Sequence, residues 1–129
     1  GTELGRLLLE TARRSPERVR REVRFAWTWP VHGERVLVQG TVDCLAEQDD
    51  GSLVLIDYKT DRGHTGLADL IQRYRMQVGL YRQAVSSILR RPVSRVYLVF
   101  LALGRVVEVG AEIEADDLAE LPPQVSSGS

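Results

Sequence analysis

One lysine and two aspartates are the residues of this chain whose types and spacing could do chemistry. The only lysine, Lys59, stands two residues after Asp57 in the run IDYKT, and the other sixteen positive side chains are arginine. Arginine is a planar fork that stays protonated, whereas lysine is a compact charge on a flexible stem that can hold or deprotonate a water. We therefore expect Lys59 to belong to a site. The alternative is an ordinary lysine at a strand end in an arginine-rich chain.

The second aspartate, Asp43, is expected to face Asp57 across a β-hairpin. The turn sequence DDG at 49–51 separates two expected strands, at residues 35–47 and 52–59. With that turn, paired residues have numbers that sum to one hundred, so the two aspartates fall opposite one another. The lysine lies on the same face as Asp57, because side chains on a strand alternate sides.

Two facing carboxylates repel one another and destabilise a sheet unless a cation lies between them. Oxygen ligands without His or Cys favour Mg²⁺ or Mn²⁺, and Mg²⁺ usually meets proteins through one or two carboxylates plus substrate phosphates. The substrate class is then phosphate esters. An ion here would polarise a phosphoryl oxygen while the lysine orients a water. The residues therefore predict phosphodiester hydrolysis, and an acid pair with a plain ion pair to lysine is the alternative.

A long helix is expected to bring two more polar groups to this site. Apolar residues between Leu67 and Ile88 recur at alternating steps of four and three, which predicts one amphipathic helix ended by the run RRP at 90–92. Gln77 and Tyr81 are four apart and share a face of it. Both could reach a substrate or the lysine; for Tyr81, packing in the core is an equal alternative.

The remaining pattern predicts a single α/β domain with a mixed sheet and helix cover. Leucines at helical spacing and runs of alternating or continuous apolar residues give the expected elements. In chain order these are a helix at 3–14, strands at 22–29, 35–47 and 52–59, the long helix, and strands at 95–103 and 106–113. The strand at 95–103 is nearly all apolar, which predicts burial on both faces. Residues 1–121 form the expected domain, and 122–129 read as a linker-like tail.

Composition narrows the function classes. The net charge of −1 argues against binding nucleic acid by bulk charge, although arginines cluster in two segments. The single cysteine, Cys44, excludes an internal disulfide and an iron–sulfur cluster with four cysteine ligands. No apolar run is long enough to span a membrane. We expect a soluble, cytoplasmic protein with no membrane partner.

Three segments of the chain together resemble the PD-(D/E)XK nuclease superfamily, and more narrowly the RecB/AddA-type nuclease domain. They are GTVD at 40–43, DYKT at 57–60 and QVGLY at 77–81. The resemblance implies a restriction-endonuclease-like α/β fold over residues 1–121. It implies that Asp43, Asp57 and the main-chain carbonyl of Tyr58 bind Mg²⁺ or Mn²⁺, that Lys59 is catalytic, and that the third segment contributes Gln77 and Tyr81. It also implies cleavage that leaves a 5′-phosphate.

The resemblance implies partners as well, and one departure from it matters. Such domains commonly form the C-terminal part of helicase–nucleases for double-strand-break repair. The implied partners are therefore single-stranded DNA, a helicase domain in the same longer chain and a second subunit. The family's first helix usually carries a metal-binding His where this chain has Gly5. Either Glu3 or Glu10 substitutes, or fewer ligands hold the metal, or the domain is a non-catalytic DNA-binding or docking module. His32 and His64 are expected to be loop residues.

Overall fold

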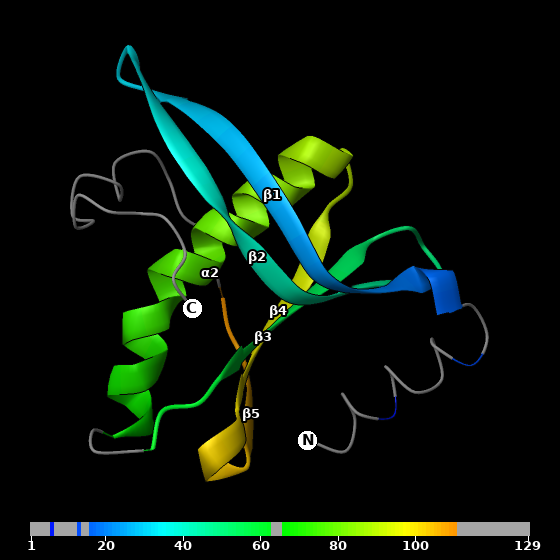
Figure 1. Cartoon of the computed structure of the whole chain (residues 1–129), viewed down its shortest axis with the longest axis vertical. Coiled ribbons are helices and arrows are strands. Elements are labelled where there is room, and N and C mark those ends of the chain that lie inside the picture. Colours follow the sequence, from blue (N-terminus) through cyan, green and yellow to red (C-terminus); the bar gives the residue numbers. More distant parts are fainter. Residues whose placement is uncertain (1–5, 7–12, 14–15, 63–65, 111–129) are drawn as a thin grey trace.

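A single mixed sheet with one long helix across it makes up the computed structural model, which describes residues 6, 13, 16–62 and 66–110 (Figure 1). The strands lie in the order β1-β2-β3-β4-β5. The elements are η1 (Pro16–Arg18), β1 (Val19–Val31), β2 (Glu34–Glu47), β3 (Leu53–Lys59), α2 (Leu67–Leu89), β4 (Val93–Phe100), η2 (Leu101–Leu103) and β5 (Arg105–Glu108). The first helix expected at 3–14, His64 and the linker-like tail lie outside the described residues apart from Arg6 and Arg13.

The expected hairpin forms between β2 and β3 with the register set by its turn. The ladder runs from Cys44↔Ile56 to Glu47↔Leu53, so its paired numbers sum to one hundred as predicted. Gly51 has a φ of 86°, a conformation that favours glycine, and Asp50 accepts hydrogen bonds from Ser52 N and Oγ at 2.9 and 2.6 Å. The turn chemistry therefore fixes which side chains of β3 face α2.

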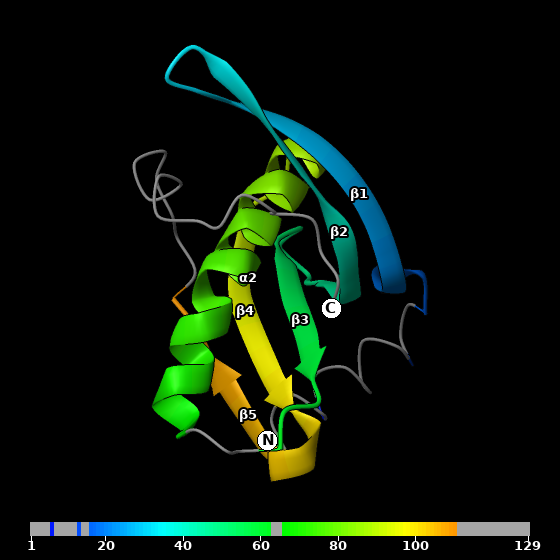
Figure 2. The same ribbon diagram turned by 60° about the vertical axis from the view of Figure 1, so that its left-hand side comes forward.

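Helix α2 connects β3 to β4, which pair in parallel from Leu53↔Val93 to Lys59↔Phe100. The predicted helix is confirmed: its buried stripe includes Leu70, Val78 and Val85, and this stripe packs on the main core cluster of the sheet. All other strand pairs are antiparallel. The sheet is therefore mixed, and α2 lies across one of its faces (Figure 2).

Strand β1 is longer at both ends than the predicted 22–29: it begins at Val19, and Trp29 and Pro30 do not end it. β1 lies at the sheet edge and pairs only with β2, where a residue without an N–H is tolerated. Together the two strands form a long curved hairpin that extends past β3 (Figures 1 and 2). His32 sits in its turn with a φ of 49°, as the loop residue expected.

Strand β4 is not buried on both faces as expected. Val96, Leu98 and Phe100 are buried on the face toward α2, whereas Ser94 and Arg95 are exposed and Tyr97 and Val99 are half-buried. The strand also ends earlier than predicted, at Phe100, because residues 101–103 form a 3₁₀ turn. The last strand covers Arg105–Glu108 and is shorter than predicted, since residues 109 and 110 are not in a strand; 111–113 lie outside the described residues. No helix in the described part of the chain is both long enough and apolar enough to cross a membrane.

Candidate active site

The C-terminal end of β3 carries two charged side chains that are almost completely buried. Asp57 is 0% exposed and Lys59 is 4% exposed, although charged side chains are rarely buried without partners. Lys59 Nζ lies 2.9 Å from Asp57 Oδ2, yet neither oxygen of Asp57 has a well-aligned hydrogen-bond donor among the described residues. A buried carboxylate in this state has spare ligand capacity.

Asp43 reaches the same place from β2, at a point where both neighbouring ladders are interrupted. The β1–β2 register steps from Arg21↔Cys44 to Val23↔Val42, and the intervening Glu22 has a left-handed φ of 53°. The β2–β3 ladder ends one pair before the two aspartates would face each other. Asp43 Oδ2 instead accepts a hydrogen bond of 2.8 Å from the N–H of Tyr58. This contact turns the Asp43 carboxylate toward the end of β3.

The pKa of Asp57 is raised by its surroundings. Burial and the neighbouring Asp43 carboxyl group raise it, Lys59 lowers it, and the net value is about 7. Near neutral pH the Asp57 carboxyl group is therefore partly protonated. A divalent cation would replace that proton, so the oxygen-only acid pair fits Mg²⁺ or Mn²⁺.

A side chain of helix α2 also contacts the lysine. Lys59 Nζ donates a hydrogen bond of 2.8 Å to Gln77 Oε1, which places the polar group predicted from the sequence directly at the site. Gln77 Nε2 in turn lies 3.5 Å from the hydroxyl of Tyr81, a long hydrogen bond. The Tyr81 ring is 1% exposed and meets Phe25 edge-on, with ring centroids 5.0 Å apart. Tyr81 thus packs in the core and supports Gln77.

Two residues of the site were not predicted. The ring centroid of Tyr74 lies 4.2 Å from Lys59 Nζ, and its hydroxyl donates to both oxygens of Asp61, at 3.1 and 2.8 Å. The signal available in the sequence was spacing alone. Tyr74 precedes Gln77 by three residues, one helical turn, and Asp61 follows the lysine by two.

A metal at this site would rest on few protein ligands. Within residues 16–62 and 66–110 there is no cluster of three or more His, Cys, Asp or Glu side chains that could hold a metal. A metal held here would have the two aspartates as its carboxylate ligands, and the resemblance implies the carbonyl of Tyr58 as a third. Glu3, Gly5 and Glu10 lie outside the described residues, so the structure assigns no replacement for the family histidine.

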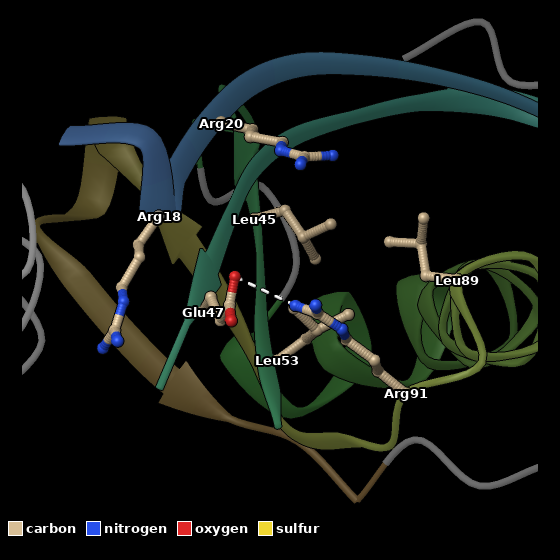
Figure 3. A pocket seen from close by; sticks show the side chains of 7 residues that line it. All are labelled: Arg18, Arg20, Leu45, Glu47, Leu53, Leu89 and Arg91. Atoms are coloured by element: carbon tan, nitrogen blue, oxygen red, sulfur yellow. Dashed lines mark ion pairs between the residues drawn. The ribbon is translucent and has the colours of Figure 1, made fainter. Parts of the chain in front are cut away.

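A separate pocket lies at the opposite end of β3 (Figure 3). Its volume is about 140 Å³, and it includes Leu53, the first residue of β3, whereas Lys59 is the last. Six residues along a strand place the two sites about 20 Å apart. Within the pocket, Arg91 pairs with Glu47 at 2.9 Å. The lining residues are Arg18, Arg20, Leu45, Glu47, Leu53, Leu89 and Arg91, and none belongs to the predicted site.

The chain matches one protein family and is similar in sequence to several curated proteins. The model of the PD-(D/E)XK nuclease superfamily matches residues 2–127. The chain is 38% identical over 121 residues to the AddA subunit of the ATP-dependent helicase/nuclease of Pediococcus pentosaceus, covering 84% of this chain and 9% of that protein. It is 47% identical over 97 residues to the protein of the same name from Desulforudis audaxviator, covering 67% of this chain and 8% of that protein. The chain thus spans about a tenth of the length of these relatives or less.

A solved structure supports the architecture. The crystal structure of SSO0001 superposes with a TM-score of 0.60 at 19% identity and covers 90% of this chain and 53% of that one. At this identity the likeness concerns the fold. The mixed sheet with α2 across it is the α/β, restriction-endonuclease-like architecture expected from the sequence.

Proposed function

Because the chain belongs to the PD-(D/E)XK nuclease superfamily, we propose that Asp43, Asp57 and Lys59 form a metal-dependent site that hydrolyses phosphodiester bonds in DNA. One observation supports this most strongly. Asp57 is buried beside a second acid and a buried lysine, and no residue that the structure describes offers a well-aligned donor to either of its oxygens. A purely structural ion pair would satisfy its oxygens, because unsatisfied buried polar groups cost stability.

The chain's own residues divide the chemistry between them. Asp43 and Asp57 would hold Mg²⁺ or Mn²⁺, and the Tyr58 carbonyl would be the third ligand. When bound, the ion supplies Lewis acidity that polarises a phosphoryl oxygen and acidifies a water. Lys59 orients that water or donates to the developing negative charge, and Gln77 fixes the direction of its ammonium group at 2.8 Å. Tyr81 holds Gln77 in turn.

The biological setting is part of the proposal. The relatives named above are helicase/nuclease subunits many times longer than this chain. We place this domain in a similar cytoplasmic helicase–nuclease, where a helicase domain and a second subunit supply unwound single-stranded DNA during double-strand-break repair. The near-neutral charge of the chain accords with this, because DNA affinity from phosphate contacts would then come mainly from the motor.

A second candidate function is a non-catalytic DNA-binding or docking module. Gly5 favours it, because glycine has no side chain with which to replace the family's metal-binding histidine. Both candidates share the fold, so they differ only in whether the acid pair loads a metal and cuts.

Cleavage of labelled single-stranded DNA with Mg²⁺ or Mn²⁺ separates the two. We expect the parent to cut and Asp57→Asn to lose cleavage while remaining folded. Asp69→Asn is the matched control, since Asp69 is an exposed aspartate in the first turn of α2 and should leave the rate unchanged. An uncut substrate with either ion, in the presence of DNA binding, would reject the nuclease and select the second candidate.

A further inference from the structure

Among the described residues, three side chains contact the Lys59 ammonium group closely. Asp57 and Gln77 contact it through charge and a hydrogen bond, at 2.9 and 2.8 Å. The third is the face of the Tyr74 ring, with its centroid 4.2 Å from Nζ. A cation within about 6 Å of a ring centroid is attracted by the ring quadrupole. At 4% exposure of the lysine, water competes poorly for this attraction.

The Tyr74 ring is itself held from its far end. Its hydroxyl donates to both oxygens of Asp61, in the segment that leaves β3. The proton stays on this hydroxyl, because burial and the Asp61 carboxylate both raise the pKa of Tyr74. A phenol that donates to a carboxylate has a more electron-rich ring, which strengthens its attraction for a cation. Asp61 also lies 3.5 Å from Arg73, whose side chain is 57% exposed and therefore competes weakly.

We propose that Tyr74 is a positioning residue for Lys59, and that Asp61 aims its ring through the hydroxyl. The Tyr74 ring meets the ammonium group in addition to Asp57 and Gln77. The carboxylate of Asp61 thereby acts on the site through the phenol. The placement is a property of the fold; its effect on cleavage rests on the proposed function.

Plain packing is the competing explanation, because Tyr74 also lies against Phe100 with ring centroids 6.5 Å apart. Packing predicts that any apolar side chain of similar size serves equally well. Positioning predicts that the ring and the hydroxyl matter separately. The three variants Tyr74→Phe, Tyr74→Leu and Asp61→Asn separate these outcomes. Phenylalanine keeps the ring without its anchor, leucine keeps apolar contact without a ring, and asparagine keeps an acceptor without the charge.

The single lysine makes the first measurement specific. In a chain labelled with ¹³C-lysine, the only Hε–Cε signal in the NMR spectrum comes from Lys59. We expect this signal upfield of an exposed lysine, because the Tyr74 ring current acts on it, and a return toward the exposed position in Tyr74→Leu. Tyr74→Phe and Asp61→Asn should give intermediate shifts or broadening. Tyr97→Phe is the control, because Tyr97 packs against a separate core cluster that includes Cys44 and Ile56. This substitution should leave the Lys59 signal unmoved.

An unmoved Lys59 signal in folded Tyr74→Leu would overturn the proposal. If that variant fails to fold, Tyr74→Phe and Asp61→Asn decide it, since parental shifts in both would show that the anchor does not aim the ring.

The second measurement is single-turnover cleavage of single-stranded DNA at saturating Mn²⁺. Misplacement of a reacting group by about 1 Å can cost about a hundredfold, so we expect Tyr74→Leu to lose on the order of tenfold to a hundredfold in rate with substrate affinity unchanged. Asp61→Asn should lose less, and Tyr97→Phe nothing. A parental rate in Tyr74→Leu would contradict positioning. If the parent itself does not cut, the proposed function fails while the NMR signal still decides the placement of Lys59.

Discussion

Replacing Asp57 by asparagine should remove a pH dependence of stability that the buried acid pair creates. The pKa of Asp57 is about 7 in the folded chain against an ordinary 3.8, mainly because burial disfavours the charged carboxylate. A folded-state pKa above the unfolded one means that the folded chain binds the proton more tightly. Stability is therefore lost as the pH rises from near 3.8 toward 7. At about 1.36 kcal/mol per pKa unit, the full loss is about 4 kcal/mol.

The assay is urea unfolding of the metal-free parent and Asp57→Asn at two pH values. Between about pH 5 and about pH 8 the parent should lose about 2 to 3 kcal/mol of unfolding free energy more than the variant, because most of the penalty falls in that window. Saturating Mg²⁺ at the higher pH should restore the parent and leave the variant unchanged. Equal losses in both proteins would show that Asp57 is already ionised at the lower pH. Burial would then not raise the pKa of its carboxyl group as inferred.

Three further variants test the site. Lys59→Arg should fold and bind metal but lose on the order of a hundredfold or more in single-turnover cleavage, because the broader guanidinium misplaces the water; a rate within about threefold of the parent would reduce Lys59 to a mere charge. Asp43→Asn combined with Asp57→Asn should abolish the calorimetric heat of Mg²⁺ or Mn²⁺ binding, and an unchanged heat would place the ion elsewhere. Tyr81→Phe should cost less than about 1.5 kcal/mol in thermal unfolding, because the edge-on contact with Phe25 remains. Its cleavage should stay within about threefold of the parent, and a loss above about tenfold would give the hydroxyl a direct part in the chemistry.

The hairpin could be predicted from the sequence almost residue by residue. A Gly-containing turn fixes the register of the strands it joins, which is why the ladder from Cys44↔Ile56 to Glu47↔Leu53 followed from the turn alone. The end of β1 could not be predicted, because proline, which lacks a backbone N–H, ends a strand only where a neighbouring strand would need that N–H. The sequence does not show that β1 lies at the sheet edge. The burial of β4 depends in the same way on what covers each face.

The site itself could be predicted in part. Alternation on β3 and helical spacing on α2 were sufficient to bring Asp57, Lys59 and Gln77 together. The contact of Asp43 with the Tyr58 N–H could not be predicted, because it depends on a local break in the strand ladders. Tyr74 was hidden for another reason. A tyrosine on an apolar stripe reads as packing, and only tertiary structure shows that its ring also faces an ammonium group.

We expect the turn between β2 and β3 to set the order in which parts of the domain fold as well. The two aspartates lie on strands joined by a tight turn, so bringing them together costs little chain entropy. Gln77 and Tyr74 reach Lys59 only after α2 has crossed to lay β4 parallel to β3, and such non-local pairing closes slowly. We expect the acids to meet before α2 has fixed the lysine, at a stage when their mutual repulsion opposes further folding. Mg²⁺ in the refolding buffer should then accelerate refolding of the parent but not of Asp57→Asn, and equal acceleration of both in stopped-flow experiments would contradict this order.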